Sequence, residues 1–518
     1  MAPSPDISEI KRIGIVGAGN MGTMMSFGFS ENGLDVSVWD VSEKNVKEAQ
    51  EMAAQTKTLK GKIDHFKDIH EFTRSLDSQP RKIFIFSITH GWPADSVLDK
   101  IKGDLKEGDI ILDGGNENYR NTERRQKEME EKGVKWIGMG VSGGYQSARR
   151  GPSMSPGGDK EAVEFVLPLL EKFSAKSAKD GKPCVQYIGP RGAGHYVKMV
   201  HNGIENGMLS AVCEAWSFLH KSLEFSYDEI GDIFEKWNAE GELRNTYLIQ
   251  IGSEICKTKK TSEGDQHGEG KGKGGYVLDD VLDKVVQDDD SSEGTGFWTV
   301  IDAAHRHVST PTIAAGHFFR VASGNRAQRL KVADNLKIPK PQQQQRADAK
   351  DKDALVESLR KAVYASFLCS FCQGLELIAR ASRDEGWDVN LGTCIQIWRA
   401  GCIIQEDHIA DMLEPILLGA KEPIMNLKLV GEVAADLRNN FDALKQITLK
   451  AIEWDNYVPA ISASLEYLKY VGGGALATQF MEAEMDFFGA HAYDRPNVRG
   501  EDPGKTAKGA HHYEWRPA

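Results

Sequence analysis

The segment 192–206 carries acid, base and amide side chains at helical spacing. Four residues stand at i, i+3, i+4 and i+7 and so share one face of a helix: Lys198, His201, Asn202 and Glu205. A lysine and a glutamate on one face suit general base and general acid catalysis, provided that their surroundings lower the pKa of the lysine and raise that of the glutamate. A solvated polar face would produce the same spacing, so this pattern alone leaves both interpretations open.

A glycine-rich turn follows the first apolar run and precedes a helical pattern. It reads Gly17-Ala18-Gly19-Asn20-Met21-Gly22, which is a GxGxxG pattern. Glycines at these positions permit a tight turn, close approach of the backbone to a pyrophosphate and close packing of helix on strand. We therefore expect a dinucleotide cofactor to bind here, at Gly17, Gly19, Asn20, Met21 and Gly22.

An acidic residue ends the next apolar run. Asp40 follows Gly19 by 21 residues, and neither an arginine nor a lysine comes directly after it. A carboxylate at this point accepts hydrogen bonds from the ribose hydroxyls and repels a 2′-phosphate. The sequence therefore favours NAD over NADP, with Asp40 as a simple turn former the alternative.

Several elements must position these residues. Short apolar runs that end in Gly or Asp alternate with helical patterns up to Pro190, at 13–17, 35–40, 82–88, 109–115 and 136–144. Runs apolar on both faces are typical of a parallel sheet covered by helices on both sides. Long helical patterns dominate after Gly194, at 196–221, 227–237, 355–382, 403–418 and 455–469. These predict a second, all-α domain.

The order of elements predicts three parts. We expect a dinucleotide-binding domain over residues 1–190, an all-helical substrate and dimerisation domain over 191–490, and a C-terminal tail over 491–518. The Gly/Lys-rich stretch 257–275 is typical of a surface loop, and the polar run 341–345 of a connector. The tail is rich in Gly, Pro and charge and is not expected to form a core alone.

Composition excludes several classes of function. The net charge of −12 argues against a nucleic-acid binder, and no stretch approaches the roughly 18 consecutive apolar residues of a membrane span. The N-terminus lacks the pattern of a secretory signal. Seven scattered cysteines include one CxxC pair, Cys369 and Cys372, which we interpret as buried thiols and not as a metal site. A soluble protein of the cytoplasm is expected, with neither metal nor membrane partner.

Ordered motifs along nearly the whole chain resemble those of the decarboxylating 6-phosphogluconate dehydrogenases, within the β-hydroxyacid dehydrogenase superfamily. They are DGGN (113–116), GVSGG (140–144), GPS (151–153), PGG (156–158), GAGHYVKMVHNGIE (192–205), GTG-x-W (294–298), WRAGCII (398–404) and FFGAH (487–491). The resemblance implies a Rossmann-like N-terminal domain, a large helical domain, and a homodimer whose tail reaches the partner's active site.

The resemblance also implies residue roles. Lys198 would take the proton of the substrate C3 hydroxyl and later protonate the C3 oxygen, and Glu205 would protonate C1 of the enediol after loss of CO₂. Matching positions would hold the substrate carboxylate and hydroxyls: Asn116, Ser142, Gly143, Gly144, His201 and Asn202. Asn116 and Thr89 would also lie at the cofactor.

Departures from the family pattern gather at two anion sites. Where the family has Tyr, Lys and Arg around the substrate 6-phosphate, this chain has Asn206, Glu293 and Met485. Other members of that pocket match: Thr295, Arg320 and His491. At the cofactor 2′-phosphate, Asn-Arg-Thr is replaced by residues 40–42 (Asp-Val-Ser), and a Lys-Ala pair by residues 89–90 (Thr-His).

The resemblance implies an oxidoreductase that oxidises the C3 hydroxyl of an aldonic 3-hydroxy acid with decarboxylation. The departures predict that it uses NAD and acts on a small sugar acid that lacks, or differs at, the 6-phosphate. Three alternatives remain. The chain could be the 6-phosphogluconate dehydrogenase of the pentose phosphate pathway, a reductase of the superfamily that does not decarboxylate, or a non-catalytic sensor that binds a dinucleotide.

Overall fold

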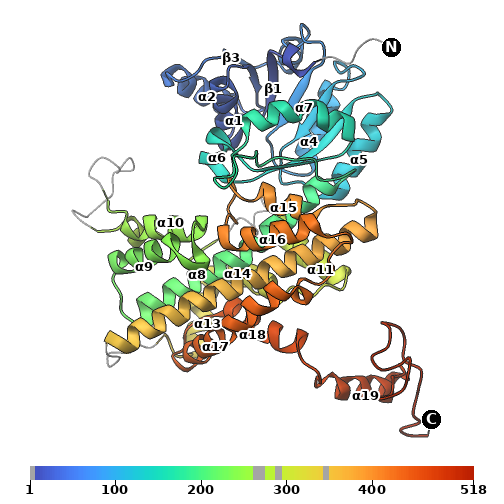
Figure 1. Cartoon of the computed structure of the whole chain (residues 1–518). Coiled ribbons are helices and arrows are strands. Elements are labelled where there is room, and N and C mark those ends of the chain that lie inside the picture. The colour runs from blue at the N-terminus through green and yellow to red at the C-terminus, as the bar shows by residue number, and fades with distance from the viewer. Residues whose placement is uncertain (1–5, 261–274, 286–293, 342–348, 518) are drawn as a thin grey trace. The chain divides into compact units, whose positions relative to one another are not determined.

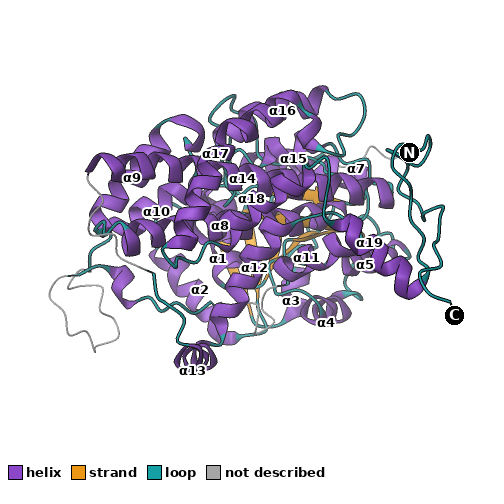
Figure 2. Cartoon of the chain, turned by 90° about the horizontal axis from the view of Figure 1, so that it is seen from below, coloured by secondary structure: helices purple, strands orange, loops and turns teal. Residues whose placement is uncertain are grey.

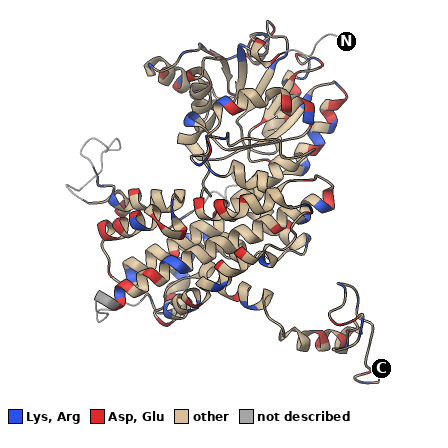
Figure 3. Ribbon diagram, in the orientation of Figure 1, with Lys and Arg blue, Asp and Glu red and all other residues tan. Residues whose placement is uncertain are grey.

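We describe a computed structural model of the chain that covers residues 6–260, 275–285, 294–341 and 349–517 (Figure 1). The predicted loop 257–275 and connector 341–345 lie mostly outside these residues. Backbone contacts divide the chain into two compact units, one up to Ser464 and one from Leu465 onward. Acidic and basic side chains are interspersed along the described elements (Figure 3).

The N-terminal part is built on a seven-stranded sheet of order β3-β2-β1-β4-β5-β6-β7. The strands are β1 (Arg12–Val16), β2 (Asp35–Trp39), β3 (Ile63–Phe66), β4 (Ile83–Phe86), β5 (Ile110–Asp113), β6 (Lys135–Val141) and β7 (Met154–Gly157). The order reverses between β1 and β4, and in such sheets ligands bind outside the carboxyl ends of the strands at that point.

The sheet differs from the prediction in two strands. The last strand, β7, runs antiparallel to β6, whereas a wholly parallel sheet was expected. β7 was not predicted because its sequence, MSPG, contains Pro156 and Gly157 and has no apolar run. β3 was missed because its IDHF sequence is only half-buried at the edge of the sheet. The bounds of the other five strands differ from those of the predicted runs by three residues at most.

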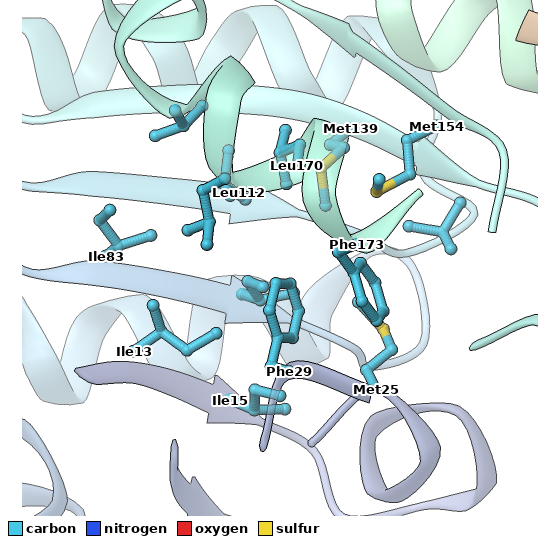
Figure 4. Packing of buried hydrophobic residues seen from close by; sticks show 14 of the residues in the cluster. Ile13, Ile15, Met25, Phe29, Ile83, Leu112, Met139, Met154, Leu170 and Phe173 are labelled. Carbon is cyan, nitrogen blue, oxygen red and sulfur yellow. The ribbon is translucent and has the colours of Figure 1, made fainter. Parts of the chain in front are cut away.

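Helices accompany the strands of this sheet. They are α1 (Asn20–Glu31), α2 (Glu43–Gln55), α3 (Ile69–Arg74), α4 (Trp92–Ile101), α5 (Tyr119–Glu130), α6 (Gly144–Arg150) and α7 (Lys160–Phe173). Two separate apolar clusters bury the strands. In the larger one Phe29 of α1 stacks on Phe173 of α7, with ring centroids 4.0 Å apart (Figure 4). Because both faces are buried, the predicted doubly covered sheet is confirmed.

Beyond this sheet domain, the longer regular elements of the described residues are all helices, joined by loops (Figure 2). They are α8 (Ala193–Ser217), which continues as a π-helical turn (Phe218–Ser222), α9 (Tyr227–Ala239), α10 (Tyr247–Lys257), α11 (Thr295–His305), α12 (Pro311–Gly324), α13 (Arg326–Leu336), α14 (Ala349–Glu385), α15 (Leu391–Ile397), α16 (Asp407–Gly419), α17 (Gly431–Glu453), α18 (Pro459–Val471) and α19 (Thr478–Gly489). The predicted helical character of this part is confirmed.

The longest helix, α14, packs against α8 and α17. Its residues 351–385 are long and apolar enough to cross a membrane by length and composition, but 94% of the most apolar window is buried within the protein. It is therefore a core helix. Cys369 and Cys372 lie on it, both buried, and burial raises the pKa of the Cys369 thiol to about 12.

In the second unit, α19 is followed by residues 490–517, which form no further helix. Asp486 of α19 accepts hydrogen bonds from the backbone N–H of Ala492 and Tyr513, from Trp515 Nε1 and from His512 Nδ1, at 2.8–3.1 Å. Burial opposes ionisation of Asp486, but these donors hold its pKa well below the usual range. The described part of the predicted tail, 491–517, thus folds back on α19, where Trp515 and Arg516 also pack against the Phe487 ring.

Candidate active site

The catalytic face predicted on the 192–206 segment lies on α8, which packs against β6 and β7. At Gly140 of β6 a Cβ would come within 2.2 Å of the Cβ of Lys198, so only glycine allows the lysine to pass the strand. Lys198 is buried, and its Nζ donates to Asn202 Oδ1 at 2.8 Å and to Ser142 Oγ at 3.1 Å. The structure therefore brings these three predicted residues together.

Asn202 makes the largest number of the hydrogen bonds described in this cluster. Its Oδ1 also accepts from Nδ1 of His201 at 3.0 Å, and its Nδ2 donates to Thr295 Oγ1 at 2.8 Å. Thr295 is the first residue of α11, so one amide joins the predicted catalytic face of α8 to a helix almost a hundred residues away in sequence. Asn202 thereby orients both the ammonium group and the imidazole.

His201 is fully buried beside Lys198. Burial, with the positive charge of Lys198 added to it, holds the pKa of His201 well below its usual value. The ring is therefore neutral, and its Nδ1 carries the proton that Asn202 Oδ1 accepts. The same Nδ1 lies 3.9 Å from Oε2 of Glu205, whose side chain is partly exposed. The predicted acid and base thus stand on one face with an uncharged imidazole beside both.

A second polar group gathers at Asn206, one residue after the predicted acid. Asn206 is buried, and its Oδ1 accepts from Nη1 of Arg320 on α12 at 3.3 Å. A Cβ at Gly296 would lie 2.8 Å from Asn206 Nδ2 and 3.0 Å from Nδ1 of the buried His317, so this glycine makes room for both. The sequence analysis missed His317. The sequence did offer one indication of it, because His317 stands three residues before the predicted phosphate ligand Arg320 and so shares a helix face with it.

The GVSGG loop packs against a loop of the helical part. Gly143 has a φ of +98°, and a Cβ there would lie 2.3 Å from the carbonyl oxygen of Gly401. The same oxygen accepts from the N–H of Ser153 at 2.9 Å. Gly144, with a φ of +70°, begins α6. The backbone of this predicted carboxylate-binding loop is thus fixed directly beside Ser142.

The glycine turn after β1 fits a dinucleotide pyrophosphate. Gly17 has a φ of +105°, and a Cβ there would lie 2.2 Å from the carbonyl oxygen of Ser87 at the end of β4. Gly22 packs as closely on the carbonyl of Gly17. A Cβ at Gly19 would point into open space, and Gly19 precedes the first turn of α1 without a side-chain cap. A helix N-terminus of this kind attracts phosphate.

Asp40 follows β2 at the same edge of the sheet. Its carboxylate accepts from the N–H of Ala18 and of Ser42, both at 2.7 Å, and from Asn45 Nδ2 at 3.3 Å. It therefore forms the turn and also contacts the glycine loop. Val41 is 79% exposed. The two interpretations of Asp40 are compatible, because a carboxylate oxygen accepts more than one hydrogen bond.

The remaining predicted residues lie in two places. Thr89 and Asn116 follow β4 and β5, so both stand at the carboxyl edge of the sheet. His491 and Met485 belong to the second unit. Glu293 is outside the described residues. Within the described ranges, no group of three or more His, Cys, Asp or Glu side chains is arranged to hold a metal ion.

Comparison with protein families gives two adjacent matches. Residues 12–189 match the family described as the NAD binding domain of 6-phosphogluconate dehydrogenase, and residues 194–515 match the 6-phosphogluconate dehydrogenase C-terminal domain.

Individual relatives match nearly the whole chain. The decarboxylating 6-phosphogluconate dehydrogenase of Emericella nidulans is 62% identical over 499 residues, 96% of this chain and 100% of that one. Two Bacillus subtilis relatives are 6-phosphogluconate dehydrogenases that differ in cofactor. The NADP⁺-dependent enzyme is 36% identical, and the match covers 95% of this chain and 98% of that one. The NAD⁺-dependent enzyme is 34% identical, and the match covers 94% of this chain and 97% of that one. The solved structure of Plasmodium falciparum 6-phosphogluconate dehydrogenase has a TM-score of 0.82 at 34% identity, and the match covers 94% of this chain and 98% of that one.

Proposed function

Because the chain belongs to the 6-phosphogluconate dehydrogenase family, we propose that it oxidises and decarboxylates 6-phosphogluconate. The main observation in support is the hydrogen-bonded cluster of Asn202 with the buried Lys198 and Ser142, in a chain that is 62% identical over 96% of its length to a decarboxylating relative. The relatives favour this activity, which the sequence analysis left as an alternative, over a substrate that lacks the 6-phosphate.

The side chains on α8 account for the proton transfers of this reaction. When bound, the nicotinamide dinucleotide accepts the hydride that leaves C3. Lys198 Nζ, held by Asn202 and Ser142, takes the proton of the C3 hydroxyl. The C3 ketone lies β to the C1 carboxylate, so it accepts the electron pair of the C1–C2 bond as CO₂ departs, and Lys198 returns the proton to the C3 oxygen. Glu205 then protonates the carbon that becomes C1 of the product, while the enediol hydroxyl gives its proton back to Lys198 and becomes the ketone.

Parallel kinetics on two substrates test the assignment. We expect kcat/KM for 6-phosphogluconate to exceed that for gluconate at least about 100-fold, because each charge-assisted hydrogen bond to a phosphate contributes about 1.5–3 kcal/mol. More efficient turnover of gluconate would overturn it. That result would support the second candidate substrate, a sugar acid without the phosphate. Asn206 favours this candidate, because it contacts Arg320 where the family pattern has a tyrosine beside the 6-phosphate.

The cofactor is a nicotinamide dinucleotide, and we infer a preference for NAD from Asp40 and Val41. The double variant Asp40→Asn with Val41→Arg removes the carboxylate and adds a guanidinium that can pair with a 2′-phosphate. We expect kcat/KM for NADP to rise at least about tenfold and that for NAD to fall. The matched control Val41→Ala should leave the ratio unchanged. A wild-type chain that already prefers NADP would contradict the inference.

Two further expectations belong to the same proposal. The chain is expected to form a homodimer in which the tail that carries His491 reaches the partner's active site, and to act in the cytoplasm. Sedimentation of the full chain, compared with a chain that ends at residue 490, tests the first expectation. The shortened chain should keep its dinucleotide affinity and lose substrate affinity.

A further inference from the structure

The first turn of α4 presents an exposed indole at the edge of the sheet where the cofactor is expected. Trp92 is the first residue of α4 and is 76% exposed. The strand that leads to it, β4, pairs with β1, and the N–H of Ser87 donates to the carbonyl of Val16 at 2.8 Å. Trp92 therefore stands at the same edge as the glycine loop that follows β1.

A buried ion pair holds the backbone directly before Trp92. Glu117 Oε2 accepts from the N–H of Gly91 at 2.7 Å, and Arg125 Nη2 donates to the carbonyl oxygen of Gly91, also at 2.7 Å. Arg125 Nη1 donates to the same Glu117 carboxylate at 2.6 Å. The carboxylate of Glu117 thus holds the N–H of Gly91, and the guanidinium of Arg125 holds its C=O. Gly91 has a φ of +78°, in the left-handed region.

The same arginine also holds α4 beyond Trp92. Arg125 Nε donates to Oδ1 of Asp95 at 2.8 Å, and Arg124 donates to both oxygens of that carboxylate. Gly91 and Asp95, on either side of Trp92, are therefore tied to α5. The backbone that carries the indole has little freedom to move.

Both charges of this pair are withdrawn from water. The side chains of Arg125 and Glu117 are 0% and 1% exposed. Burial opposes ionisation of Glu117, but hydrogen bonds from Asn121 and Arg125 keep its pKa below the usual value. A buried ion pair contributes little net stability once desolvation is counted, so its clear effect here is to fix geometry.

An exposed apolar residue lies on the other side of the glycine loop. Val41 follows β2, which pairs with β1 on the side opposite β4. β2 and α4 share one apolar cluster, and the Lys100 ammonium of α4 lies 6.0 Å from the centre of the Trp39 ring of β2. Trp92 and Val41 thus flank the edge at which Asp40 contacts the glycine loop.

We propose that Trp92 is a platform on which the adenine ring of the dinucleotide stacks, and that Glu117 and Arg125 are positioning residues that hold it there. The inference rests on the proposed function, since it requires a dinucleotide at the glycine loop. A flat base stacks well on an indole, and Val41 offers an apolar contact for its other face. The adenine is common to NAD and NADP, so the platform serves either cofactor.

Equilibrium binding to the full chain tests the proposal without turnover. The probes are NADH, NADPH, ADP-ribose, which keeps the adenine, and reduced nicotinamide mononucleotide, which lacks it. We expect Trp92→Ala to raise the Kd of the dinucleotides and of ADP-ribose about 10-fold, within the 5- to 150-fold range of base stacking. The Kd of the mononucleotide should not change. Trp92→Phe should restore most of the affinity, and Met52→Ala, an exposed site on α2, should have no effect.

A variant of Glu117 tests the positioning role separately. Glu117→Ala should weaken the same adenine-containing probes and spare the mononucleotide, with the far-ultraviolet circular dichroism unchanged. If that variant does not fold, Trp92→Ala still decides. Unchanged dinucleotide binding by Trp92→Ala, an equal loss for the mononucleotide, or a change in oligomeric state alone would overturn the proposal. A wild-type chain that binds neither NADH nor NADPH would instead refute the proposed function.

Discussion

Lys198→Met should fold normally and show a kcat for 6-phosphogluconate about 10³-fold or more below that of the wild type. Methionine has nearly the length of lysine but no group that can accept the C3 hydroxyl proton, and general base catalysis contributes about 10²–10⁴-fold. The hydrogen bonds from Nζ to Asn202 and Ser142 disappear with it. Steady-state kinetics measure the loss, and dinucleotide titration should give an unchanged Kd.

Two comparisons make the Lys198 result specific. Lys198→Arg keeps the positive charge but cannot act as a base near neutral pH, so it should be nearly as inactive. Lys160→Met, at an exposed lysine of α7, should retain full activity. A Lys198→Met enzyme within tenfold of the wild-type kcat would show that another group is the base. A wild-type chain that binds dinucleotide but turns over no sugar acid would favour the sensor alternative.

Glu205→Gln should lower kcat by about 10²–10⁴-fold with a smaller effect on the KM for 6-phosphogluconate. The amide has the shape of the carboxyl group but no proton to give the enediol carbon. Because glutamine keeps the size and shape of the side chain on the helix face that it shares with Lys198, we expect the Lys198–Asn202 hydrogen bond to remain. Reaction in deuterated water, with the label at C1 of the product followed by NMR, reports the step directly.

The control for this variant is a surface glutamate. Glu254→Gln on α10 should not alter the rate or the label. If the Glu205→Gln enzyme still added deuterium to a single face of the enediol carbon at the wild-type rate, another residue would have to be the acid that protonates C1. A normal rate of CO₂ release followed by slow protonation would instead place the defect at the expected step.

The fold could be predicted wherever burial leaves a simple pattern in the sequence. β1, β4 and β5 are apolar on both faces, and their runs predicted a covered sheet. β3 and β7 lie at the two ends of the strand order, where half-burial and residues such as Pro156 remove that pattern. Their pairing depends on strands already in place, which local periodicity does not report.

The candidate site divides in the same way. Helical spacing was enough to place Lys198, His201, Asn202 and Glu205 on one face. The contacts of Asn202 with Thr295, and the closeness of His317 to Asn206, join positions about a hundred residues apart and were not visible in the sequence. Glu117 and Arg125 were missed for a similar reason, because their importance comes from Gly91 on a neighbouring loop.

The burial of α14 has a consequence for biosynthesis. Its apolar surface is covered by α8, which the ribosome makes earlier, and by α17, which begins at Gly431, well after α14 ends at Glu385. In a nascent chain, the apolar segment 351–385 is therefore complete before α17 has been synthesised, and the surface that α17 later covers is still exposed. Because transiently exposed apolar surface promotes aggregation, we expect this interval of translation to be the one in which the polypeptide is most prone to misassociate.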